Sequence, residues 1–269
     1  LRSSPDLSPQ DRVVASLQVI KQLYAVNPKH PEALNYIADH HFWSWVTPAG
    51  LHARAIHGSD HVTLSGESSE LFHPAQAVRI NGVTYRLKSS RDAVDEHTLL
   101  LATPFAGEDT EKAEIQVRDT ASCLAYALES AKVAKVSSLR SEALELAGRC
   151  YHVNDNWAKA REMYEKAIRA NKKNILAQYE MIQICIHYAS VSKTKKEKED
   201  LRNQARTYLA SCTQYGGSSH EITFLAAYLQ FKSNDWTKAL STVEALPDRP
   251  DQLSPRTFLH MQLSKAQLL

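Results

Sequence analysis

Histidines crowded into the first third of the chain are the residues best suited to metal chemistry. His57 and His61 stand four positions apart, a spacing that on a helix would let both rings share a metal ion. Gly58 disfavours a continuous helix between them, and no HExxH motif or cysteine pair supplies further ligands. We therefore expect no metal site, although the same part of the chain holds four more histidines: His40, His41, His52 and His73.

The sequence also lacks the motifs of other catalytic chemistries. No GxxxxGK[ST] or GxGxxG loop is present to cradle phosphate groups, and without a GxSxG elbow no serine can be nominated as a nucleophile. The carboxylates of "GEDTEKAE" and "EKEDLR" are typical of exposed loops and helices, not of a buried acid–base pair. We expect a protein that is not an enzyme and that takes no cofactor and no small-molecule substrate.

Charge and composition indicate a soluble intracellular protein. The formal charge of +2, from 32 basic and 30 acidic residues, creates no global field that would attract nucleic acid or an anionic membrane. No apolar run approaches the roughly 18 residues of a membrane span. Four cysteines stand far apart without a CxxC pair, so we expect them to be reduced and buried: Cys123, Cys150, Cys185 and Cys212.

An internal repeat decides the expected fold. "NDNWAKA" at 154–160 recurs as "SNDWTKA" at 233–239, a separation of two periods of about 34 residues plus an insertion of about 11. Around the first copy, residues 141–174 fit the tetratricopeptide (TPR) pattern. Small residues at Gly148 and Ala160 would let two antiparallel helices approach, while Tyr151 and Tyr164 fill the space beside them. The sequence predicts a mainly α fold, a TPR right-handed α-solenoid with a small inserted β-sheet module.

Three segments follow from the repeat phase. We expect N-terminal TPR helices at 1–46, an inserted β-rich module at 47–119, and TPR helices continuing the solenoid at 120–269. The first helix of the second repeat should run to about Val46. The chain begins at Leu1 without methionine and stops at Leu269 inside an apparently helical segment, so we expect it to be a piece of a longer protein.

The inserted segment carries strand signals at 62–64, 77–87, 98–101 and 114–117. Asn81-Gly82 predicts a hairpin with a type I′ turn, which sets the pairs 80–83, 79–84, 78–85 and 77–86. Residues 78, 80, 83, 85 and 87 should then share an apolar face. Arg79, Arg86 and Lys88 should lie on the other, as a face that either meets water or contacts a partner.

A solenoid would present a concave partner groove lined by its first helices. The expected groove positions in the last two units are unusually aromatic and apolar, which favours a bound peptide or helix unless a following helix covers them. The expected groove residues are Asn35, Asp39, Phe42, Glu145, Arg149, His152, Tyr179, Gln183, Ile186, Phe224, Tyr228 and Phe231. A lysine run between 186 and 205 should be a solvated loop and helix start.

Two stretches carry a family resemblance, "NPKHPEALNYIADHHF" and "GRCYHVNDNWAKAREMYEKAIRANKKNILAQYEMIQICIHY". They resemble the TPR scaffold subunit of the polymerase-associated factor (PAF) transcription elongation complex. The resemblance covers 11–46 and 120 to about 188; the segment 47–119 departs from it. It implies a nuclear, non-catalytic scaffold that binds other subunits of the complex, helps to dock them on RNA polymerase II, and supports elongation and co-transcriptional histone modification.

Two alternatives stay open. One is a chaperone-adaptor TPR module that clamps a peptide tail, although Asp39 and Glu145 in the expected groove disfavour an acidic tail as its ligand. The other is an enzyme or a nucleic-acid-binding role built on the insertion. Three basic side chains without exposed, interleaved aromatic residues fall short of a nucleic-acid signature, so we expect no direct nucleic-acid ligand and no membrane contact.

Overall fold

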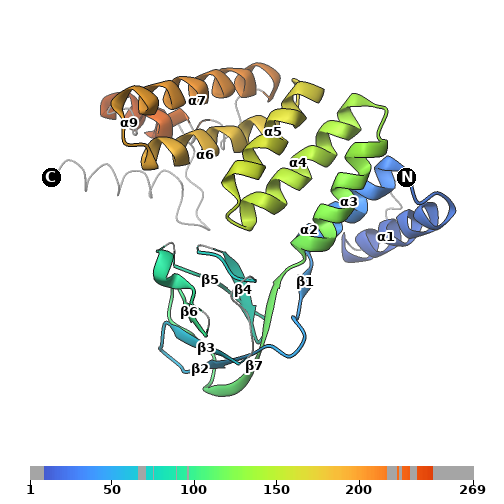
Figure 1. The fold of residues 1–269 in the computed structure, drawn as a ribbon, viewed down its shortest axis with the longest axis vertical. Coiled ribbons are helices and arrows are strands. Elements are labelled where there is room, and N and C mark those ends of the chain that lie inside the picture. Colours follow the sequence, from blue (N-terminus) through green and yellow to red (C-terminus); the bar gives the residue numbers. More distant parts are fainter. Residues whose placement is uncertain are drawn as a thin grey trace. The chain divides into compact units, whose positions relative to one another are not determined.

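A computed structural model of the chain describes residues 9–65, 71–74, 76–88, 90–95, 97–216, 223, 226–230 and 235–244. The chain divides into two compact units, Leu1–Met163 and Tyr164–Leu269 (Figure 1). The first unit contains helices and the whole β-sheet, and the second is helical in its described residues.

The helices of the first unit are α1 (Pro9–Val26), α2 (Pro31–Trp43), α3 (Thr120–Val133), α4 (Ser137–Val153) and the start of α5 (Trp157–Ala170). Pro31 favours the beginning of α2, because its fixed φ suits the first helical position and its missing N–H has no partner there. Small side chains let α2, α3 and α4 pack closely around larger ones. Met163 of α5 joins their shared core, which otherwise contains Ala38, Phe42, Cys123, Ala127, Leu146, Ala147 and Cys150.

In the second unit, α6 (Ile175–Val191) packs against α7 (Lys195–Gly216), and α9 (Trp236–Glu244) follows. The core there includes Ile182, Cys185, Ala205, Cys212 and Leu229. The expected solvated stretch before Ala205 is mostly helix, because α7 begins after a break of only a few residues. Thr194 accepts the backbone N–H of Glu197 at 3.2 Å, as a helix N-cap residue does, so the helix start that was expected in the lysine run takes up most of it.

The sheet consists of β1 (Trp45–Val46), β2 (His52–Ala55), β3 (His61–Ser65), β4 (Ala77–Ile80), β5 (Val83–Arg86), β6 (Thr98–Leu100) and β7 (Thr110–Arg118). Six strands lie in the order β5-β4-β7-β2-β3-β6, with β1 paired to β7, and all the pairs are antiparallel. The sheet curls, so that Leu87 and Leu101, just beyond its two edge strands, form a bridge. Alternate side chains point into the curl and build its core.

The predicted hairpin is confirmed in turn and register. Its four strand pairs are those expected, and Asn81 and Gly82 have φ of 47° and 82°. Asn81 also anchors the turn to β7, since its side chain accepts the backbone N–H of Glu114 at 2.9 Å. One expectation for the apolar face was wrong: Val83 is exposed beside the turn, whereas Tyr85 is buried.

The expected fold class, a mainly α solenoid with a small β insertion, was wrong. The protein is a mixed α and β fold in which a curled antiparallel half-barrel sheet has its own hydrophobic core. That core holds large buried side chains from strands and loops alike, among them Phe72, Leu99, Phe105 and Ile115. The repeat pattern assigned too little of the core to the strands.

Two sequence-based boundaries also differ from the structure. Helix α2 ends at Trp43, not near Val46, and the chain enters β1 directly. Strand β2 had no signal in the sequence, because His52–Ala55 is polar and small and such residues have low strand propensity. Its pairing with β3 and β7 supplies the stability that local preference lacks.

Candidate functional site

Arg149 on α4 connects several of the expected groove positions in the first unit. Its guanidinium lies 3.7 Å from Asp39 Oδ1 and 3.6 Å from Glu145 Oε1, and it stacks over the ring of Phe42 at 4.1 Å. The structure therefore brings side chains of α2 and α4 together around one cation. A stacked guanidinium keeps its N–H edges in plane, where carboxylates can bind.

Several of these expected groove residues have structural contacts instead of a free surface. Asn35 is 8% exposed, and its amide donates to the carbonyl oxygen of Leu139 at 3.0 Å. Phe42 and Glu145 are buried as well. His152 is half-buried, with its ring 4.4 Å from that of Trp157. Binding to a partner in this unit thus stays a prediction for the more accessible side chains.

The remaining groove positions lie in the second unit. Tyr179 and Ile186 are half-buried on α6 and pack against the core of that unit, and Gln183 is half-buried on the same helix. Tyr228 is also half-buried. Two expected groove residues, Phe224 and Phe231, lie outside the described residues.

An aromatic–arginine ladder runs from α2 and α4 onto the sheet. Arg149 lies 5.5 Å from the ring of Trp43, and Arg118 lies 5.2 Å from that same ring. Arg118 is also 4.2 Å from the ring of Trp45, where Arg79 approaches at 4.7 Å. The ladder consists of Phe42, Trp43, Trp45, Arg79, Arg118 and Arg149.

Strand pairing determines the positions of the ladder residues that lie on the sheet. Trp45 on β1 is directly opposite Arg118 on β7, and Arg79 on β4 is opposite Gln116, two residues earlier on β7. Because side chains alternate along a strand, Arg118 and Gln116 share one face. Val117 between them points into the sheet core, which puts both arginines and the indole on the outer surface.

The junction between α2 and β7 keeps the two parts of the ladder in register. Asp119 donates its backbone N–H to the carbonyl oxygen of Ser44, and its carboxylate accepts the Nδ1–H of His41 at 2.7 Å. Arg118 donates to the carbonyl oxygen of Trp43 at 2.7 Å. The segment that leaves α2 and the segment that leads into α3 are therefore hydrogen-bonded to each other next to the helices.

The charge at the sheet end of the ladder is not neutralised within the described part of the chain. Partial burial lowers the pKa of Arg118, and the nearby positive charge of Arg79 lowers it further. No described carboxylate lies within ion-pair distance of either guanidinium. The side chain of Arg79 makes no hydrogen bond to the described residues, and its Nε is buried without a partner.

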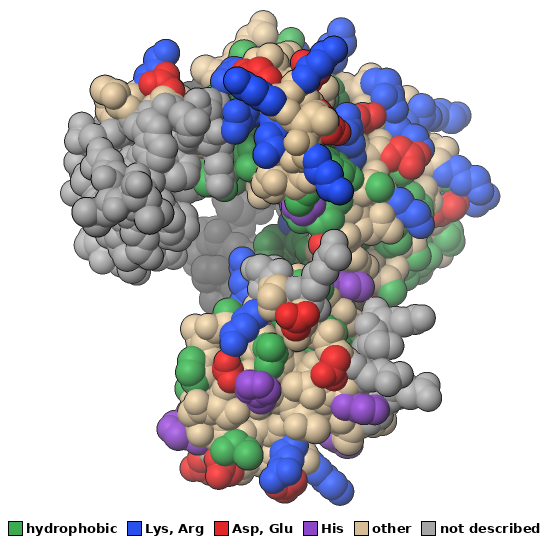
Figure 2. All heavy atoms as spheres, turned by 60° about the vertical axis from the view of Figure 1, so that its left-hand side comes forward, with side chains coloured by type: hydrophobic (Ala, Val, Ile, Leu, Met, Phe, Trp, Pro, Cys, Tyr) green, Lys and Arg blue, Asp and Glu red, His purple; other side chains and the backbone are tan. Residues whose placement is uncertain are grey.

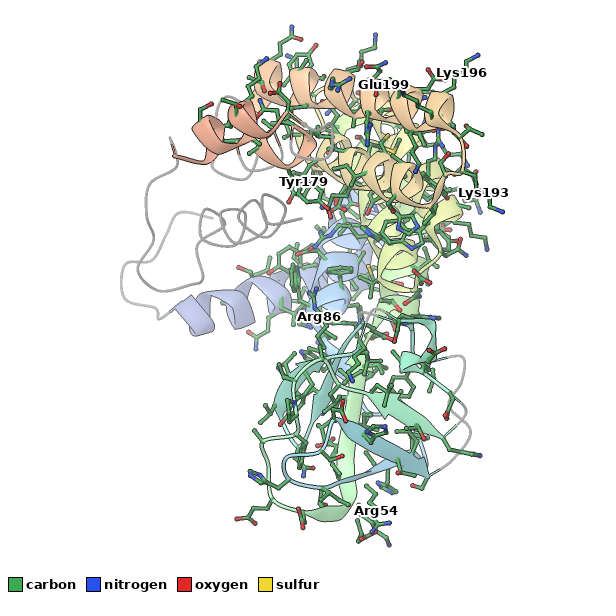
Figure 3. The ribbon with its side chains drawn as sticks, turned by 90° about the vertical axis from the view of Figure 1, so that its left-hand side faces the viewer. Arg54, Arg86, Tyr179, Lys193, Lys196 and Glu199 are labelled. Carbon is green, nitrogen blue, oxygen red and sulfur yellow. The ribbon has the colours of Figure 1, made fainter. Side chains whose placement is uncertain are left out.

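The three residues of the expected basic face have different surroundings. Lys88 forms an ion pair with Asp60 at 2.5 Å, and this hydrogen bond, together with one from His61, lowers the pKa of the Asp60 carboxyl. Arg86 is exposed at the helix-proximal end of the sheet, whereas Arg54, which pairs with Glu111, lies at the opposite end (Figure 3). The face is therefore not a uniform basic patch, and Arg79 belongs to the ladder.

Sequence reasoning missed the tryptophans and Arg118. The signal was present in "FWSWV", where three aromatic residues fall within four positions at the end of a helix. Tryptophan offers the best ring face over which an arginine or lysine can stack. Arg118 had no local signal, because only the pairing of β1 with β7 brings it beside them.

The histidines do not gather into a metal centre in the residues that the structure describes, where no group of three or more potential ligands is arranged to hold an ion. They are engaged singly instead. The Nδ1–H of His57 donates to the carbonyl oxygen of Gly107 at 3.1 Å, and His61 bonds to Asp60 at 2.7 Å. Figure 2 shows histidines scattered over the sheet-bearing part of the view.

The four cysteines are confirmed as free and buried. Burial raises the pKa of Cys212 to about 11, and the Cys123 thiol together with burial raises the pKa of Cys150. The burial of all four is typical of structural, unreactive thiols.

No known family and no curated protein matches this sequence. Among the helices that the structure describes, none combines the length and apolar character needed to cross a bilayer. Lys196 at the start of α7 and Lys193 in the connection before it are exposed and project outward in Figure 3. Glu199 on that helix pairs with Arg202 and Arg206, as on a solvated helix face.

Proposed function

We propose that this chain is a non-catalytic scaffold that binds other proteins through the aromatic–arginine ladder. One observation carries the proposal. Trp43 at the end of α2 is 56% exposed, although tryptophan is usually well covered, and the guanidiniums of Arg118 and Arg149 flank its ring. Tryptophan and arginine are the residues most enriched at the energetic centres of protein–protein interfaces.

The ladder is also organised before any partner arrives. Stacking and the bond from Arg118 to the Trp43 carbonyl restrict side chains that would otherwise lose freedom on binding. Pre-ordered side chains lower the entropic cost of association, so a small exposed surface can contribute a useful share of the affinity.

The partners that we propose are subunits of the PAF transcription elongation complex and, through them, RNA polymerase II. This part of the proposal rests on the resemblance of 27–42 and 148–188 to the scaffold subunit of that complex. On this resemblance we propose that the protein acts in the nucleus, in elongation and co-transcriptional histone modification.

Affinity capture from nuclear extract tests the proposed partners. The tagged chain should recover identified elongation-complex subunits, and polymerase should be enriched above a tag-only control. Recovery of chaperones without elongation factors or polymerase would contradict the proposed complex and support the chaperone-adaptor alternative.

A further inference from the structure

The outer face of β1, β7 and β4 presents two arginines on one indole. Arg118 and Arg79 lie 4.2 Å and 4.7 Å from the ring centroid of Trp45, so that both cations share one aromatic surface. They sit on neighbouring strands and are offset by two residues, since Arg79 is opposite Gln116. Diagonal neighbours of this kind are about 7–8 Å apart across a sheet.

Neither of these two charges has a carboxylate partner of the kind that Arg54 and Lys88 have. Arg54 pairs with Glu111 at 3.0 Å and Lys88 pairs with Asp60 at 2.5 Å, whereas no described carboxylate reaches Arg79 or Arg118. Two like charges held close together repel each other, and an incoming anion relieves that repulsion. The face is thus complementary to negative charge.

We propose that this face binds an extended acidic segment of a partner protein, with carboxylates on alternate residues. The inference rests on the proposed scaffold function and names the chemistry of one partner segment. An extended chain rises about 3.3 Å per residue, so side chains two positions apart lie about 7 Å apart on one side, close to the spacing of the two arginines. Each guanidinium can then receive one carboxylate in a planar, two-bond geometry.

The surroundings favour a short acidic peptide over nucleic acid. Both guanidiniums already approach the indole of Trp45, which leaves less of its face for a base to stack on. Glu114 projects from the outer face of β7, and its hydrogen bond from Thr47 lowers the pKa of its carboxyl, so it is charged at neutral pH. A continuous phosphate backbone would pass this negative charge, whereas a short acidic segment can end before it.

Fluorescence anisotropy with two labelled probes tests the proposal on the whole chain. One probe is a four-residue peptide, Asp-Ser-Asp-Ser, which is short enough to end before Glu114, and the other is single-stranded oligothymidine of about 12 nucleotides. Arg79→Gln is the main variant, because the Arg79 side chain makes no hydrogen bond whose loss would weaken the fold. Arg54→Gln removes a paired arginine at the far end of the sheet and serves as the matched control.

The peptide should bind more tightly than the oligonucleotide. Arg79→Gln should weaken peptide binding about tenfold, as expected for a charge-assisted contact, and Arg79→Lys should recover only part of it because lysine cannot form the two-bond geometry. Arg54→Gln should bind as the wild type does. Equal peptide binding by wild type and Arg79→Gln, or tighter binding of the oligonucleotide, would overturn the inference.

This experiment separates failure of the inference from failure of the proposed function. If nuclear capture recovers elongation subunits while Arg79→Gln leaves peptide binding unchanged, the scaffold role stands and the acidic-segment site is wrong. If the peptide binds through Arg79 but capture recovers none of the expected subunits, the site stands and the proposed complex is wrong.

Discussion

Asp119, the residue through which the chain returns from the sheet to α3, should be the most sensitive point of the junction beneath the ladder. Its carboxylate accepts the backbone N–H of Ser122 at 3.2 Å and the Nδ1–H of His41 at 2.7 Å. The side chain is only 12% exposed, so water replaces neither bond easily. Removing the carboxylate should therefore weaken both the start of α3 and its link to α2.

The two bonds allow the cost to be estimated separately. Loss of a helix N-cap costs about 1 kcal/mol, and loss of a hydrogen bond to a charged group costs about 1.5 kcal/mol. Asp119→Ala should thus lower the free energy of unfolding by about 2.5 kcal/mol, which corresponds to a decrease in Tm of roughly 5–10 °C for a unit of this size. Asp119→Asn should cost about 1.5 kcal/mol, because asparagine still caps the helix but cannot also accept from His41.

Differential scanning calorimetry measures these changes, and His41→Phe supplies the control. Phenylalanine can keep the stacking of this ring on Tyr126, at 5.4 Å, while losing the bond to Asp119. His41→Phe and Asp119→Asn should then have similar effects, and the double variant should be little worse than either alone. A Tm for Asp119→Ala within 1 °C of the wild type, or strictly additive single changes, would refute this account of the junction.

Three further predictions concern the same unit and the buried thiols. Burial lowers the pKa of His73 below its usual 6.5, partly opposed by the charge of Asp155; the unfolded chain therefore binds the proton more readily. The stabilisation that comes from keeping His73 neutral should be complete above pH 6.5 and should be lost as the pH falls below that value. The decrease in Tm between pH 7.5 and pH 5.5 should therefore be smaller for His73→Gln than for the wild type. An equal decrease in the two proteins would contradict this. Gly82→Ala should lower the free energy of unfolding by about 1 kcal/mol; an added Cβ would meet open space, so the cost comes from the positive φ alone. Gly82→Asn should be less destabilising, as measured by urea unfolding. Equal stability of the wild type and the two variants would contradict the type I′ turn. Iodoacetamide at pH 8 should alkylate none of the four buried cysteines until the chain is unfolded, and native labelling seen by intact mass would disprove their burial.

Local patterns predicted the hairpin but not the sheet that contains it. Asn81-Gly82 and the alternation around it determine turn and register within a few residues, and the structure has both. The order β5-β4-β7-β2-β3-β6 depends on pairings between distant segments, which no short pattern encodes. The half-barrel and its separate core were therefore underestimated as a small insertion.

The candidate site shows the same limit. Aromatic residues in "FWSWV" could be seen in the sequence, and Arg79 was expected on a polar strand face. Their association with Arg118 arises only when β7 returns beside β1 and Asp119 bonds back to α2. Groove residues chosen by repeat phase, such as Asn35 and Phe42, proved to be buried, because helix packing within the first unit covers them.

We expect partners to bind through the exposed ladder, and Trp43→Ala removes its most exposed aromatic ring. Quantitative capture from nuclear extract should compare this variant with Leu176→Ala, which removes a similarly exposed apolar side chain, 61% against 56%, from α6. A tryptophan at an interface centre contributes about 2 kcal/mol or more, so Trp43→Ala should reduce affinity about 30-fold and deplete elongation subunits, while Leu176→Ala captures them as the wild type does. Equal capture of those subunits by Trp43→Ala and wild type would show that the ladder does not bind them.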